Sequence, residues 1–161
     1  MACYAQAMSK DALLSALAPL LQALPALVDQ DPAQAKAELD RLFPLSSLAA
    51  VRALVRSGVD QRWLCDREHE GVRFSRVLKA AGPAFSVDAV HMNGAGAGHT
   101  HPGGEFDLCF AVDGAPRFDG NVEGWTVYAP GTWHVPTVSG GTMDILYFLP
   151  GGQITFGPRS V

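Results

Sequence analysis

The 161-residue chain has little charge, few cysteines and no long uninterrupted apolar run. Charged residues make up 17% of it, and 12 Lys and Arg stand against 16 Asp and Glu, for a formal net charge of −4. Because the basic residues are few and scattered, we expect no nucleic-acid partner. Cys3, Cys65 and Cys109 form no CxxC pair. An odd number of cysteines without a secretory signal predicts reduced thiols and a cytoplasmic location.

The apolar segment that comes nearest to a membrane span covers residues 12–28, which carry no charge. It is slightly short for a bilayer, and Pro19, Gln22 and Pro25 interrupt it. We therefore expect no membrane-spanning helix. A hydrophobic content of 48% over this length fits one globular domain, or a small domain with a helical extension.

The composition changes partway along the chain. Leucine and alanine dominate before Gly58, whereas 14 of the 17 glycines lie at or after Gly94. The first part therefore predicts helices, and the second predicts short strands and turns. We expect an α+β fold, mainly β, in which a helical segment over residues 1–60 precedes a β-domain over residues 61–161. The helices would pack on that domain or on a partner subunit.

About three helices are expected in the first part. The first begins near Ser9, a suitable N-cap, and Pro19 should kink or split it. The second follows an aspartate–proline cap. The third should be capped by Ser46 or Ser47 and should end at Gly58.

Alternating apolar residues predict seven or eight strands in the second part. The expected strands are residues 72–79, 85–93, 106–112, 125–129, 133–137, 142–149 and 153–156. Many short strands at such spacing are typical of a barrel or jelly roll. The alternation places Phe106 and Leu108 on one face of their strand, and Glu105, Asp107 and Cys109 on the other. The charged run before Gly71 reads as a solvated loop.

Three histidines and one acid form the most informative pattern. His99 and His101 are two residues apart, so they share a face on an extended strand. Glu105 follows a Pro-Gly-Gly turn that can fold it back toward the pair, and His134 follows a Pro-Gly turn in a distant segment. Imidazole and carboxylate donors together suit transition metals. We predict one divalent ion (Fe, Mn, Zn or Ni) on these four residues, with Glu105 open between ligand and acid–base. Alternatively, they only hydrogen-bond one another.

Residues 94–149 resemble the cupin superfamily, whose two motifs can be followed in the sequence. The motif residues are Gly94, His99, His101, Glu105 and Gly114, then Gly124, Pro130, Gly131 and His134. Several spacings depart from the usual cupin motifs, but none of the departures falls on a predicted ligand. The chain is also similar to the bacterial 4-hydroxylaminobenzoate lyase family. The similar runs are residues 98–102, 107–110, 116–120, 134–138 and 146–152.

This resemblance implies a cupin (jelly-roll) β-barrel after the helical segment, and the homodimer that is usual for cupins. It further implies conversion of 4-hydroxylaminobenzoate to 3,4-dihydroxybenzoate with release of ammonia, in nitroarene degradation. Family members that act on other aromatic acids are also conceivable. The expected partner is therefore a small aromatic acid.

Such a reaction needs an acid to protonate the oxygen that departs from nitrogen. Asp107 shares its predicted face with Glu105, and an aspartate inside a barrel is costly unless it is paired or functional. Asp107, Glu105 and Tyr128 are therefore the candidate catalytic residues. For Asp107 the alternatives are a solvated rim position and a contact to a metal ligand.

A substrate carboxylate calls for an arginine, whose planar fork of N–H donors matches it. Arg73, Arg76 and Arg117 are the candidates, and for each the alternative is a surface salt bridge. Trp133 is a candidate for stacking on an aromatic ring, although most barrel aromatics belong to the core.

Two other functions remain open from the sequence. One is a cupin Fe(II) dioxygenase that acts on a small aromatic or diketone substrate, and oxygen consumption would separate it from a lyase. The other is a cupin that binds a small molecule without catalysis, which predicts binding with no product.

Overall fold

The computed structural model describes residues 8–82 and 84–160. The helices are α1 (Lys10–Ala23), η1 (Leu24–Leu27), α2 (Pro32–Leu42), η2 (Leu45–Ser47) and α3 (Ala49–Gln61), where η marks a 3-10 helix. The strands are β1 (Arg67–His69), β2 (Val72–Leu78), β3 (Phe85–Met92), β4 (His99–His101), β5 (Glu105–Phe118), β6 (Gly124–Tyr128), β7 (Thr132–His134), β8 (Val138–Pro150) and β9 (Thr155–Phe156). The described residues thus form an α+β fold, mainly β, with three α-helices before the strands, as expected.

The helices begin largely as expected and end differently. The Ser9 hydroxyl accepts a hydrogen bond from the Ala12 N–H at 3.1 Å and caps α1. Of the kink or split expected at Pro19, the split does not occur, because α1 continues to Ala23 before the chain tightens into η1. Leu17 and Leu20 on either side are buried, and this packing outweighs the one backbone hydrogen bond that a proline removes. Among the described residues, no helix is long and apolar enough to cross a membrane.

The predicted limits of the third helix are both wrong. Ser46 and Ser47 lie in η2, and α3 begins at Ala49 without a side-chain cap. The helix also runs through Gly58 to Gln61. A Cβ atom on Gly58 would lie 2.6 Å from the Leu64 side chain, so this glycine serves close packing rather than termination.

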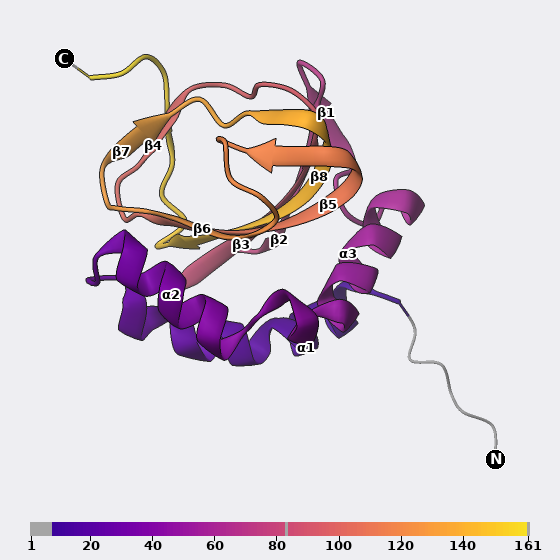
Figure 1. Cartoon of the computed structure of the whole chain (residues 1–161), viewed down its shortest axis with the longest axis horizontal. Coiled ribbons are helices and arrows are strands. Elements are labelled where there is room, and N and C mark those ends of the chain that lie inside the picture. Colours follow the sequence, from indigo (N-terminus) through magenta and orange to yellow (C-terminus); the bar gives the residue numbers. More distant parts are fainter. Residues whose placement is uncertain (1–7, 83, 161) are drawn as a thin grey trace.

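The strands form two antiparallel sheets rather than one continuous hydrogen-bonded cylinder. One sheet has the order β1-β2-β3-β8-β5-β6, and the other has the order β7-β4-β9. Figure 1 shows the strands curving around the interior of the β-domain, with the helices along one side. The long strands β5 and β8 pair along most of their length. The charged run that read as a loop is the edge strand β1.

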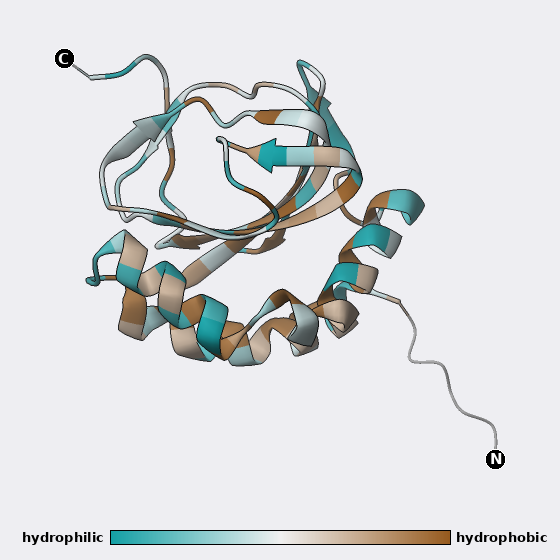
Figure 2. Cartoon of the chain, in the orientation of Figure 1, coloured by the Kyte–Doolittle hydropathy of each residue, from teal (hydrophilic) through white to brown (hydrophobic). Residues whose placement is uncertain are grey.

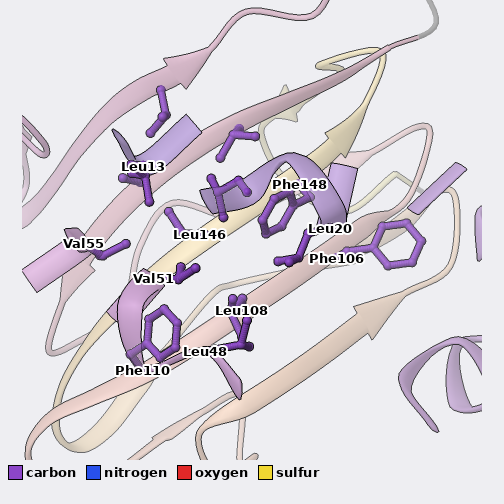
Figure 3. Packing of buried hydrophobic residues seen from close by; sticks show 14 of the residues in the cluster. Leu13, Leu20, Leu48, Val51, Val55, Phe106, Leu108, Phe110, Leu146 and Phe148 are labelled. Carbon is purple, nitrogen blue, oxygen red and sulfur yellow. The ribbon is translucent and has the colours of Figure 1, made fainter. Parts of the chain in front are cut away.

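The six-stranded sheet has a different neighbour on each face. Its outer face packs on the apolar sides of the helices, as Figures 2 and 3 show. The residues labelled in Figure 3 are Leu13, Leu20, Leu48, Val51 and Val55 from the helical part, with Phe106, Leu108, Phe110, Leu146 and Phe148 from β5 and β8. The inner face carries a second apolar cluster that includes Val90, Cys109 and Ile145. The predicted alternation of β5 is confirmed, and it leaves Glu105 and Asp107 on the inner face.

Candidate metal centre

Three strands bring the four predicted ligands together. His99 and His101 point to the same side of β4, and His99 lies directly opposite His134 of β7. Glu105 is the first residue of β5 and returns to the pair through a turn at Gly104, whose φ is 90° and whose N–H bonds His101 O at 3.1 Å. The left-handed backbone of this turn favours glycine. The predicted folding back of the acid is therefore seen in the structure.

The four side chains converge on a single point. One nitrogen or oxygen of each lies within 4.8 Å of the others. His134 Nε2 is 3.0 Å from His99 Nε2 and 3.0 Å from Glu105 Oε2, and His101 Nε2 is 3.1 Å from the same oxygen. His99, His101 and Glu105 are almost entirely buried. Within the described chain, His101 Nε2 and both carboxylate oxygens of Glu105 have no hydrogen-bond partner. These unpartnered donors fit a divalent metal ion.

The opposite nitrogen of each imidazole is held by an acceptor. His99 Nδ1 donates to Ala97 O at 3.0 Å, His101 Nδ1 donates to Gln153 O at 3.1 Å, and His134 Nδ1 donates to Asp119 Oδ2 at 2.8 Å. An acceptor at Nδ1 keeps the proton there and turns the lone pair of Nε2 inward. This is the arrangement that metal-binding histidines usually show.

The surroundings of the cluster shift the pKa values of His99 and His134 in opposite directions. Burial, together with the neighbouring His101, lowers the pKa of His99 to about 4, so this imidazole is neutral at pH 7. Burial alone would lower the pKa of His134, but its contacts with the carboxylates of Asp119 and Glu105 outweigh burial and raise that pKa to about 9. When no ion is bound, His134 therefore carries a proton on both ring nitrogens at neutral pH, and a metal ion at Nε2 would displace one of them while the proton on Nδ1 stays with Asp119.

The sequence missed Asp119, which supports one side of the cluster. Its Oδ2 accepts hydrogen bonds from His134 Nδ1 and from the Tyr128 hydroxyl at 2.5 Å, and its Oδ1 accepts one from the Thr137 N–H at 2.8 Å. An Asp-Gly pair usually signals a turn, so only its place in a run shared with the lyase family could have indicated this role. Tyr128 therefore bonds Asp119, and its ring packs on His134 with centroids 4.6 Å apart.

Asp107 is fully buried beside the cluster. It lies two residues from Glu105 on the inner face of β5, opposite Tyr147 of β8 and Thr126 of β6. Neither of its carboxyl oxygens has a hydrogen-bond partner among the described residues. Burial raises the pKa of Asp107 well above its usual range, and the charge of Glu105 adds to the rise. These surroundings favour the protonated form of the carboxyl group.

A cavity of about 600 Å³ opens beside His99. Its walls are mainly apolar and include Val72, Phe74 and Phe156. The Phe156 ring stands edge-on to the His99 ring, with centroids 5.7 Å apart. A mainly apolar cavity with a few polar groups in its wall suits a small aromatic molecule.

Of the residues predicted to bind substrate, Arg76 lines this cavity, whereas the other three have contacts elsewhere. Arg76 donates two hydrogen bonds to Asp88, at 2.7 and 3.2 Å. The remaining contacts are Arg73 to the carbonyls of Cys65 and Val59, Arg117 to the Gly120 carbonyl, and Trp133 to the Gly157 carbonyl.

Comparison with known proteins identifies relatives of the chain. Residues 26–156 match the sequence profile of a family described as PnbB: 4-hydroxylaminobenzoate lyase. The 4-hydroxylaminobenzoate lyase of Nocardioides sp. (strain LMS-CY) is 32% identical over 119 residues, which cover 66% of this chain and 70% of that protein. The enzyme of the same name from Pseudomonas putida is 29% identical over 126 residues, covering 66% and 72%. An RmlC-like cupin protein from Ralstonia eutropha JMP134 is similar in structure, with a TM-score of 0.43, 12% identity and coverage of 55% and 61%.

Proposed function

The chain belongs to the 4-hydroxylaminobenzoate lyase family, and from this we propose that it is a metal-dependent lyase acting on a hydroxylamino-aromatic acid. The proposed reaction converts 4-hydroxylaminobenzoate, or a close relative, to 3,4-dihydroxybenzoate and ammonia. The observation that carries the proposal is the buried cluster of His99, His101, His134 and Glu105, of which His99 lines a mainly apolar cavity.

The proposed reaction is balanced without an oxidant or a reductant. The N–O bond breaks, oxygen from water is added to the ring, and hydrolysis of the resulting imine releases ammonia. Overall, one water molecule is consumed. A divalent ion held by the cluster would act as a Lewis acid that weakens the N–O bond.

The residues of the chain have separate roles in this proposal. The apolar walls around Phe74 and Phe156 hold the ring and keep bulk water away from it. Asp107 remains the proposed acid, because its unpartnered carboxyl group lies next to the cluster on the inner face of the sheet. Tyr128 instead positions His134 through Asp119, to which its hydroxyl donates.

The first test is anaerobic incubation with 4-hydroxylaminobenzoate, with metal analysis of the same sample. We expect a catechol and ammonia from the wild type. His101→Ala should lose both the bound metal and at least about a hundred-fold in turnover, because one donor of four is gone. Arg41→Gln, on the exposed side of α2, serves as the control and should retain both.

Each other outcome favours a different function. Turnover that persists in metal-free His101→Ala would rule out the metal-dependent reaction. Product that forms only with oxygen would favour the Fe(II) dioxygenase. Binding without any product would favour a non-catalytic cupin.

A further inference from the structure

The hairpin of β1 and β2 forms one wall of the cavity. In its register Arg67 lies opposite Phe74, and His69 lies opposite Val72. Side chains alternate along a strand, so these four share one face with Arg76. All five line the cavity that reaches His99. The charged run of β1 is therefore part of the cavity wall.

The two arginines on this wall differ in their partners. The Asp88 carboxylate accepts two hydrogen bonds from Arg76 and neutralises its charge. Arg67, by contrast, is exposed and has no ion pair or side-chain hydrogen bond with any described residue. Glu70 also lines the cavity; its side chain is 79% exposed at the hairpin turn, and its Oε1 lies 4.0 Å from His69 Nε2. Arg67 is thus the cavity cation that can accept an anionic partner.

We propose that Arg67 binds the carboxylate of the substrate and makes the cavity selective for aromatic acids over neutral arenes. The inference rests on the proposed function for the identity of the acid. A para-substituted ring is rigid and carries its two functional groups at opposite ends. With the nitrogen end at the cluster beside His99, the ring lies against apolar residues such as Phe74. The carboxylate then reaches the mouth of the cavity.

The arrangement on the hairpin favours this assignment. Cross-strand neighbours such as Arg67 and Phe74 have Cβ atoms only about 5 Å apart, so a ring packed on Phe74 brings its substituent to Arg67. The guanidinium group offers two parallel N–H donors that match a carboxylate. The exposed His69 stands on the same face and can add a further donor.

Equilibrium binding of two unreactive ligands tests the proposal. 4-Hydroxybenzoate carries the carboxylate, and 4-hydroxybenzamide is its neutral counterpart of nearly equal size. We expect the wild type to bind the acid more tightly. Arg67→Gln should weaken acid binding about ten-fold or more and change amide binding less than about two-fold. Arg67→Lys should fall between, and Arg41→Gln should match the wild type.

The alternatives give different results. Acid binding that is unchanged in Arg67→Gln overturns the proposal, as does equal binding of acid and amide by the wild type. If the double variant Arg76→Gln/Asp88→Asn alone removes the preference, the carboxylate site is at Arg76. These measurements need no turnover. A preference that depends on Arg67 in a protein that forms no catechol would therefore refute the lyase reaction and leave the inference standing.

Discussion

At the scale of single residues, Asp119 orients the His134 ring within the cluster. The residue adopts a left-handed φ of 47° at a turn, and its carboxylate accepts three hydrogen bonds. Burial alone would raise the pKa of Asp119, but the hydrogen bonds from His134, Tyr128 and Thr137 outweigh it and lower that pKa. The carboxylate is therefore charged at neutral pH, which keeps the proton on His134 Nδ1 and makes Nε2 a better donor to a metal.

Asp119→Asn should weaken metal binding about 10- to 100-fold without unfolding the protein. Asparagine has nearly the same size and tolerates the left-handed backbone, so the change removes the charge and little else. Competition with a chelator measures the affinity, and circular dichroism checks the fold. Asp40→Asn, on the exposed face of α2, is the matched control. Equal metal affinity in the two variants would contradict this role.

At the scale of elements, a buried ion pair fixes α3 to the six-stranded sheet. Arg56 Nη1 lies 2.9 Å from Asp144 Oδ2 of β8, and His91 Nδ1 of β3 bonds Asp144 Oδ1 at 2.7 Å. The Asp144 side chain is only 2% exposed. Because an unpaired charge is costly in such a place, the helix must keep its register on the sheet to keep this contact.

Asp144→Asn should lower the free energy of unfolding by about 1–3 kcal/mol, since it leaves a partly buried arginine without its partner charge. Asp60→Asn is a close control: Asp60 pairs with the same Arg56 at 3.1 Å, but its side chain is 67% exposed. Exposed pairs contribute little, so this variant should change stability by less than about 0.5 kcal/mol. Denaturant unfolding of both variants measures the difference, and similar losses would show that burial is not what matters.

Elements in which apolar residues recur at a regular spacing could be predicted from the sequence, and elements without such a repeat could not. The faces of β5 follow from strict alternation between the helix-facing and inner sides of the sheet. The end of α3 could not be predicted in this way. Gly58 lies inside the helix because its missing side chain leaves room for Leu64, and the sequence alone does not indicate this packing contact. The edge strand β1 has three exposed residues and hence no period to detect. The residue pattern therefore does not indicate that Arg67 lines the cavity.

The four residues of the candidate metal site were predictable because motif spacing identifies their side chains. Their supports were harder to predict, because Ala97 and Gln153 contribute backbone carbonyls. Every residue has a backbone carbonyl, so these supports leave no pattern in the sequence.

At the scale of the whole molecule, the cluster joins the two sheets. His99, His101 and His134 belong to the three-stranded sheet, and Glu105 belongs to the six-stranded sheet. Without a cation, the fold must bury a carboxylate and three close imidazoles with incomplete hydrogen bonding. A metal ion that binds the folded chain and not the unfolded one therefore stabilises the whole fold.

Chelation of the metal should lower the Tm of the wild type. Free metal at a thousand times its dissociation constant stabilises the folded state by about 4 kcal/mol, which corresponds to roughly 10 °C for a domain of this size. For His101→Ala the Tm should be the same with metal and with chelator, whereas Asp60→Asn should show the same difference in Tm as the wild type. Calorimetry or thermal circular dichroism measures the shift. Thermal unfolding needs no substrate. If neither metal nor chelator changes the Tm of the wild type, the result would argue against the metal site itself, whatever reaction the cavity supports.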